Sequence, residues 1–360
     1  MSVHEILIVI MAVFAALGAI DRIFGNRLGL GHPFEEGILA MGTLALAMLG
    51  IISLAPVLAN LLNPVVVPVY RFLGADPAMF AGTILACDMG GGSLAQQMSS
   101  DPAAALMGGV LCGSMLGATI VFTIPVAMGI LKEEDRPAMA KGVLAGIVTV
   151  PVGLLAGGLV AGFPIGMVLR NLIPIVLIGG LIALGLVFAE KGMIKGFGIF
   201  GKGVIIVITI GLGAAIVEEL TGFTVIPGLA PLSEGFETVG AIAIVLAGAF
   251  PLVHVITKLL QKPLMKLGKL LGVNDVAAGG LVATLANSIA TFERVKDMDS
   301  RGKVVNIACA VSAAFVFGDH MGFTAGFAPE MLPAMIVGKL VGGVTAVAVA
   351  LLLTRKKREN

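Results

Sequence analysis

The 360-residue chain contains no tryptophan and one tyrosine, so an aromatic cage for a quaternary amine is not expected. It also lacks a phosphate-binding G-x-x-x-x-G-K-[ST] loop, an H-E-x-x-H zinc motif and a G-x-S-x-G nucleophile turn. The missing nucleotide loop argues against an ATP-driven pump. His4, His32 and His254 show no metal-ligand spacing. The sequence therefore predicts no cofactor, no metal site and no enzyme.

Charge is scarce as well. Charged residues make up 12% of the chain, about half the ~25% of a soluble domain. Hydrophobic residues reach 58%, and the mean hydropathy is +1.06. Fifty glycines would let helices pack closely within a lipid bilayer. No basic patch interleaved with aromatics points to a nucleic-acid partner. We therefore predict an all-α, polytopic integral membrane protein.

Three cysteines, Cys87, Cys112 and Cys309, all lie in apolar segments. They are predicted to be small buried thiols rather than disulfide partners. The N-terminus has no basic region and no small-residue cleavage site. Residues 5–20 are therefore expected to be a retained span rather than a signal peptide.

About ten or eleven hydrophobic segments are expected, because one span needs about 20 apolar residues. The candidate spans are residues 5–20, 36–60, 103–131, 138–162, 165–189, 202–220, 238–260, 303–327 and 331–353. Segments 62–72, 77–97 and 275–293 are ambiguous. No long linker interrupts the pattern, so residues 1–360 are predicted to form a single transmembrane domain. A homo-oligomer is left open.

One stretch of the first half recurs in the second. Gly74 corresponds to Gly272, Asp76 to Asn274 and Gly82 to Gly280, at a constant offset of 198 residues. Polar or helix-breaking residues interrupt both copies. We predict internal repeats at about residues 36–131 and 238–327. Duplicated interrupted segments are typical of a transporter's binding site.

Basic residues distinguish the two copies. Lysines and arginines flank the second copy on both sides, within 258–269 and 294–303, whereas few flank the first. By the positive-inside rule the second copy enters and leaves the membrane on the cytoplasmic side. Such a segment is re-entrant, and its arms of about nine residues reach roughly 14 Å, near the midplane. The opposite flanking charge predicts inverted repeats, with parallel repeats of ordinary spans as the alternative.

Non-helical backbone at membrane depth survives where it lines a wet cavity or is buried in protein. Both interrupted segments, together with the polar pair in F-V-F-G-D-H-M-G-F, therefore supply candidate substrate-binding residues. These are Asp88, Gly90, Gly91, Ser93, Gln97, Asn287, Ser288, Thr291, Asp319 and His320. An ionisable residue inside the membrane is a functional candidate by default. The alternatives are helix capping, helix–helix hydrogen bonding and a buried Asp–His pair.

Several motifs resemble one known family. They are F-E-E-G at 34–37, M-F-A-G-T-I-L-A-C-D-M-G-G at 79–91, G-V-L-A-G-I-V-T-V-P at 142–151, I-P-G-L at 226–229, V-A-T-L-A-N at 282–287, G-D-H-M-G-F at 318–323 and M-I-V-G-K-L-V-G-G-V-T-A at 335–346. Together these motifs resemble the EutH-type ethanolamine permeases of bacterial ethanolamine-utilisation operons. The resemblance implies uptake of ethanolamine across the bacterial cytoplasmic (inner) membrane. The paired interrupted segments are also similar in layout to concentrative nucleoside transporters.

The polar candidates suit ethanolamine, whose amine is protonated at neutral pH as a lysine amine is. Asp88 or Asp319 would hold the ammonium, and Asn287, Ser288, Ser93 or Gln97 would hold the hydroxyl. Alternating access or facilitated diffusion would carry it, with proton or sodium coupling open. Alternatives are a carrier of a nucleoside or another amino alcohol, an intramembrane aspartyl protease and a non-transporting receptor.

Overall fold

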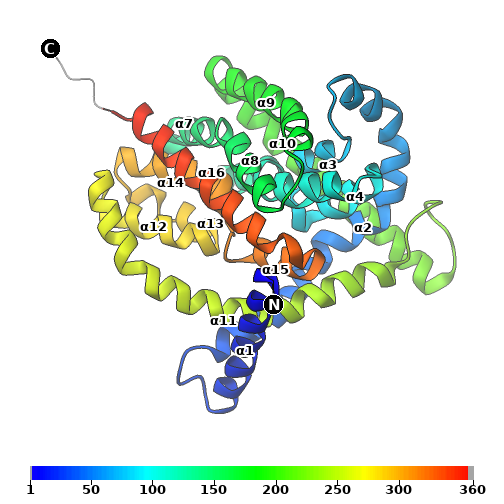
Figure 1. Ribbon diagram of the computed structural model, residues 1–360, viewed down its shortest axis with the longest axis horizontal. Coiled ribbons are helices and arrows are strands. Elements are labelled where there is room, and N and C mark those ends of the chain that lie inside the picture. The colour runs from blue at the N-terminus through cyan, green and yellow to red at the C-terminus, as the bar shows by residue number, and fades with distance from the viewer. Residues whose placement is uncertain (1, 356–360) are drawn as a thin grey trace.

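The computed structural model describes residues 2–355, and every regular element among them is helical (Figure 1). Eight segments are long and apolar enough to span a membrane, counted over the described residues. Their bounds are Val3–Ile23, Gly31–Phe72, Pro102–Ile130, Glu133–Val160, Ile165–Phe188, Glu190–Thr221, Leu232–Pro263 and Pro329–Leu353. The prediction of an all-α polytopic membrane protein is confirmed.

Sixteen α-helices were delimited in the described residues. They are α1 (Val3–Ile23), α2 (Gly31–Phe72), α3 (Ala78–Ile84), α4 (Gly91–Met98), α5 (Pro102–Leu106), α6 (Ile124–Ile130), α7 (Arg136–Ile147), α8 (Val150–Val160), α9 (Ile165–Phe188), α10 (Glu190–Thr221), α11 (Leu232–Leu271), α12 (Asp275–Ala286), α13 (Ser288–Phe292), α14 (Ser300–Ala313), α15 (Asp319–Phe327) and α16 (Leu332–Leu353). Short 3₁₀ turns and the π-helical stretches η2 (Met107–Gly117) and η3 (Thr119–Thr123) lie between them.

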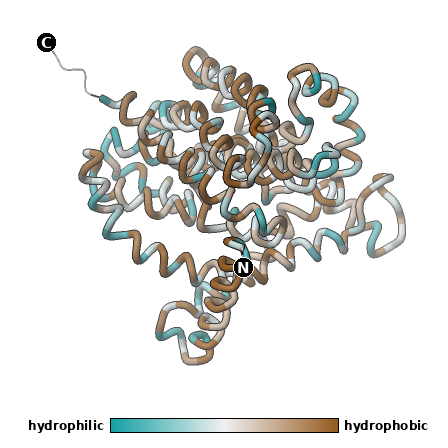
Figure 2. Tube along the Cα trace, viewed as in Figure 1, coloured by the Kyte–Doolittle hydropathy of each residue, from teal (hydrophilic) through white to brown (hydrophobic). Residues whose placement is uncertain are grey.

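Apolar side chains cover much of the outside. Figure 2 shows hydrophobic residues along most of the helices. Leu181 on α9 and Ile206 on α10 are 67% and 58% exposed. Such exposure over many helix turns would be costly in water and is the surface that lipid requires. In contrast, 83% of the most apolar 18-residue stretch of the span Pro102–Ile130 is buried. This span therefore lies inside the helix bundle.

Two very long helices, α2 and α11, pack against each other and form the frame. Helix α1 of the first half packs on α11 of the second half, and α10 of the second half packs on α2 of the first half. The ambiguous segment 62–72 is the end of α2 rather than a separate element. In the view of Figure 1, α3 and α4 lie to the right of the molecule and α12 and α13 to the left.

The first interrupted segment is a hairpin. Helix α3 ends at Ile84, and α4 starts at Gly91 and packs back against α3. The hydroxyl of Ser99 donates to the Asp76 carboxylate at 2.9 Å, which joins the two ends of the segment. The segment therefore enters and leaves at one end of the molecule, as a re-entrant element does.

The second interrupted segment repeats this arrangement. Helix α12 ends at Ala286, and α13 follows after the extended residue Asn287. The backbone N–H of Asn274 donates to the Asp299 carboxylate at 2.9 Å, and its side-chain amide donates to the Asp297 carbonyl at 3.0 Å. The ends of this segment also lie together, so both predicted interruptions are confirmed.

The correspondence between the two copies extends to backbone conformation and packing. Gly74 and Gly272 both have a positive φ, at 72° and 67°. A Cβ at Gly82 would meet the Gly108 carbonyl oxygen at 1.8 Å, and one at Gly280 would meet the Asn306 side-chain oxygen at 2.4 Å. The two contact positions again differ by 198 residues. The opposite orientation of the two copies in a membrane stays a prediction.

One predicted span is wrong. Residues 303–327 do not form a single helix, because α14 ends at Ala313 and α15 begins at Asp319. In the break, the Phe315 N–H donates to the Thr284 carbonyl at 3.1 Å and the Phe317 N–H to the Leu285 carbonyl at 2.9 Å. These bonds replace the helical ladder with contacts to the second hairpin. They also impose a φ of +62° on Phe315, which is strained for a side chain with a Cβ.

Candidate functional site: a cavity at the break of the first hairpin

A cavity of about 720 Å³ lies where the first hairpin breaks. Its walls come from α2, the break before α4, the span of η3 and α6, α10 and the start of α15. Much of the lining is apolar, with Leu44, Phe122 and Phe315 among its residues. The polar side chains Asp88, Asp319 and His320 line the same cavity, and Lys195 and Lys202 of α10 also lie along it. A largely apolar cavity with a few convergent polar groups is typical of a small-molecule site.

The break positions Asp88 through its backbone. Leu85 is extended, a single 3₁₀ turn (η1, Cys87–Met89) follows, and Gly90 has a φ of +87°. A Cβ on Gly90 would lie 1.8 Å from a methyl carbon of Ile51, so both the conformation and the space require glycine there. The Asp88 side chain is consequently held at the cavity wall and is 17% exposed.

His320 faces Asp88 from the other half of the chain. Its Nε2 lies 3.8 Å from Asp88 Oδ1, and its side chain is 3% exposed. Its ring also packs against Phe315 with 5.3 Å between ring centroids. Asp319 lies in the first turn of α15, where the positive end of the helix favours a carboxylate. The structure thus brings Asp88 together with two other predicted site residues, Asp319 and His320, which lie far from it in sequence.

Sequence reasoning missed Lys339. This lysine of α16 is 1% exposed and donates from Nζ to the backbone carbonyl of Ser114 in η2. It interacts electrostatically with Asp88 and His320. A lysine within an apolar, glycine-rich span was itself the available signal, because a buried cation is costly unless a partner stabilises it.

The other residues of the first hairpin play different parts. Gly90 and Gly91 are buried and shape the turn. Ser93 is half-buried and Gln97 is exposed, both on α4. Among the described residues, the lining of the cavity includes none of these four. Their predicted contact with a substrate stays a prediction.

The residues of the second hairpin organise its own turn. Asn287 is exposed, and its side chain accepts the Ile289 N–H at 2.8 Å as a helix cap. Thr291 is buried, bonded to the Thr284 hydroxyl at 2.8 Å and donating to the Gly280 carbonyl at 2.9 Å. The hydroxyl of Ser288 is buried without a hydrogen-bond partner. The structure links this hairpin to the cavity through the break 314–318 and does not place these three side chains in the cavity's lining.

Comparison with known sequences identifies the family. A family model described as "Ethanolamine utilisation protein, EutH" matches residues 3–353. The chain belongs to the EutH family. The match covers all eight spans and both hairpins, so the whole membrane domain is shared by the EutH family.

Relatives match this EutH-family chain over nearly the full length of both proteins. A protein named probable ethanolamine permease EutH from Listeria monocytogenes is 64% identical over 356 residues, covering 99% of this chain and 95% of that protein. One of the same name from Salmonella typhimurium is 49% identical over 394 residues, covering 99% and 97%. YxeR of Bacillus subtilis, named an uncharacterized protein, is 52% identical over 354 residues, covering 98% and 96%. No solved structure matches the chain.

Proposed function

We propose that this chain is an ethanolamine permease that carries protonated ethanolamine across the bacterial cytoplasmic membrane. Relatives at 49–64% identity are named probable ethanolamine permeases. The eight spans embed the chain in a bilayer, and the cavity gives a small polar solute a place to bind within them. A permease rather than an enzyme accounts for both observations.

The two carboxylates in the cavity lining, Asp88 and Asp319, are the observation that carries the proposal. When Asp88 and Asp319 are ionised and Lys339 is protonated, these three groups carry one net negative charge, while Lys195 and Lys202 along the same cavity are exposed. Ethanolammonium has one positive charge and would bring the group to neutrality. Because an unbalanced charge is expensive at membrane depth, these groups favour binding of a monovalent cation over a neutral or anionic solute.

The cavity also suits the size and the second polar group of ethanolamine. A volume of about 720 Å³ holds a molecule of four heavy atoms together with several waters. In this proposal the ammonium group binds Asp88 and Asp319. The hydroxyl group bonds to His320 or to water, because a neutral imidazole nitrogen can donate or accept.

In this proposal the three breaks in the helices act as hinges for alternating access. Residues 314–318 and the two hairpin turns lack a continuous helical ladder, so elements on either side can move with little loss of hydrogen bonding. A negative interior favours entry of a monovalent cation by about 2.3 kcal/mol per 100 mV. Uptake down this potential requires no coupling ion.

Purified protein in liposomes tests the proposal. Labelled ethanolamine should accumulate inside when an interior-negative potassium diffusion potential is imposed, and less when the potential is abolished. Separate proton and sodium gradients distinguish coupling from simple voltage-driven entry. Failure of properly folded protein to move ethanolamine under any gradient would refute the proposed function.

A further inference from the structure

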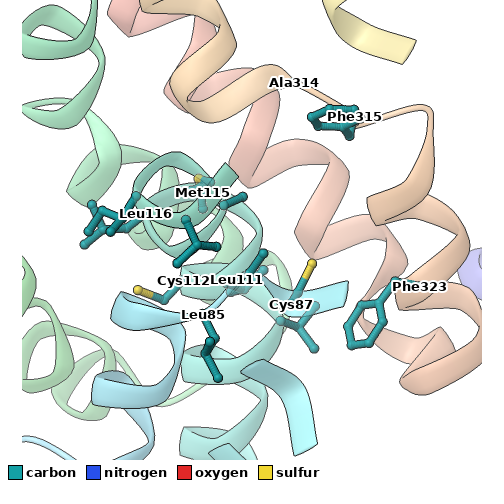
Figure 3. Close-up of a cluster of buried hydrophobic side chains, with 14 of the residues drawn as sticks. Leu85, Cys87, Leu111, Cys112, Met115, Leu116, Ala314, Phe315 and Phe323 are labelled. Carbon is teal, nitrogen blue, oxygen red and sulfur yellow. The ribbon is translucent and has the colours of Figure 1, made fainter. Parts of the chain in front are cut away.

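Cys87 lies beside Asp88 in the break of the first hairpin, and its thiol is buried. The Cys87 sulfur, a carboxylate oxygen of Asp88 and a ring nitrogen of His320 all lie within 4.8 Å of one another. Figure 3 shows the Cys87 side chain near Phe323 of α15, while the side chain of Cys112 points to the other side of the cluster. Of these two buried thiols, Cys87 is the one grouped with His320.

This set of atoms matches the ligands of a borderline-soft divalent cation. Zinc binds cysteine sulfur at about 2.3 Å and histidine nitrogen or carboxylate oxygen at about 2.0–2.2 Å, in a tetrahedral arrangement. Tetrahedral ligand atoms are then about 3.3–3.8 Å apart. The 3.8 Å separation between His320 Nε2 and Asp88 Oδ1 is slightly longer than the roughly 3.3–3.5 Å of a nitrogen and an oxygen on one zinc ion, so a small side-chain shift would bring both atoms to the metal. Sites with three protein ligands keep a fourth position for water or another molecule.

The surroundings of the trio also favour a cation. His320 Nδ1 is buried with no hydrogen-bond partner, so no hydrogen bond from that nitrogen fixes the ring. Metal binding replaces the thiol proton of Cys87, which leaves with water through the cavity. A zinc ion, the Cys87 thiolate, the two carboxylates Asp88 and Asp319, and the Lys339 ammonium together sum to no net charge. The repulsion from Lys339 is thereby offset by the second carboxylate.

We propose that Cys87, Asp88 and His320 form a Zn²⁺-binding site in the cavity wall, and that an ion bound there blocks transport. The metal and the substrate ammonium would compete for Asp88. The inhibition rests on the proposed function, whereas metal binding does not. Asp88 and His320 line the cavity, through which Zn²⁺ would enter and reach the buried Cys87 thiol.

Metal binding is measured on the purified, chelator-treated protein by competition with a chromophoric zinc indicator. The test compares wild type with Cys87→Ser, which keeps the size of the side chain but removes the thiolate. Cys112→Ser is the matched control, because Cys112 is equally buried but outside the trio. We expect one Zn²⁺ per chain for wild type and Cys112→Ser, and at least tenfold weaker binding for Cys87→Ser. Equal zinc affinity in all three proteins would overturn the site.

Transport into liposomes is the second measurement. Micromolar Zn²⁺ should inhibit ethanolamine uptake by wild type and by Cys112→Ser, and a chelator should restore it. Cys87→Ser should transport in the absence of zinc and resist inhibition, and Mg²⁺ should inhibit none of the proteins. Inhibition of Cys87→Ser at the wild-type zinc concentration contradicts the proposal. Cys87-dependent zinc binding without ethanolamine uptake by wild type would support the metal site and refute the proposed permease function.

Discussion

His320 Nε2 lies 3.8 Å from Asp88 Oδ1, and this pair joins the two halves of the chain at the cavity. Asp88 belongs to the break of the first hairpin, and His320 lies in the first turn of α15, the short helix after the break 314–318. That second break is in turn hydrogen-bonded to the second hairpin. A change in charge at Asp88 is therefore expected to alter contacts in both halves of the chain.

Replacing Asp88 with asparagine tests its role in binding. The substitution keeps the shape of the side chain but removes the charge that the substrate ammonium would meet. Hydrogen bonds to a charged group contribute about 1.5–3 kcal/mol, so ethanolamine uptake should fall roughly 10- to 100-fold. Uptake per folded protein in liposomes provides the measurement.

The matched control for Asp88→Asn is Asp275→Asn, the same change at an exposed position at the start of α12. This variant should transport like wild type. Uptake by Asp88→Asn at the level of the control would remove Asp88 from the substrate site.

Lys339 is expected to be coupled energetically to Asp88. Lys339→Met keeps a long apolar stem but leaves Asp88 without its buried counter-charge, so the melting temperature should fall. Adding Asp88→Asn removes one uncompensated charge and should restore part of the stability. Thermal unfolding in detergent of the two single variants and the double variant gives the coupling, expected at about 0.5–3 kcal/mol. Strictly additive effects would show that the two groups do not interact.

The close approach at Gly82 predicts a large effect from one methyl group. In Gly82→Ala the new Cβ would collide with the backbone oxygen of Gly108, which cannot rotate away. Overpacking of this kind costs about 1–3 kcal/mol. Gly42→Ala is the control, because no atom lies within 4 Å of its added Cβ. Melting in detergent should be lowered in the first variant only, and equal melting temperatures would contradict the packing described here.

Cysteine labelling tests the inverted orientation of the hairpins. Single cysteines at the exposed positions Arg71 and Ser100 flank the first hairpin, and those at Asp275 and Lys296 flank the second. The native cysteines are buried and should react slowly. In intact cells a membrane-impermeant maleimide should label the first pair, and it should reach the second pair only after permeabilisation. Labelling of the two ends of one hairpin from opposite sides would exclude a re-entrant segment.

Much of the fold follows from local composition. Few charges and long apolar stretches require a membrane protein, since such a chain cannot cover its surface in water. The hairpins were predictable as well, because C-D-M-G-G-G and A-N-S carry polar or helix-breaking residues into apolar segments. The offset of 198 residues between the two hairpins can be read from the sequence. The structure extends it to packing, because Gly82 approaches Gly108 and Gly280 approaches Asn306.

Tertiary structure alone decided the break at 314–318 and the composition of the cavity. The sequence A-F-V-F-G of this break contains no proline and no charged residue that would end a helix. The break exists because carbonyls of the second hairpin accept the N–H groups of Phe315 and Phe317. The meeting of Cys87 and Asp88 with His320 likewise depends on packing between distant segments, as does the bond from Lys339 to Ser114. Hydropathy and helix-breaking signals are local along the chain, whereas these contacts arise only when helices far apart in sequence close on one another.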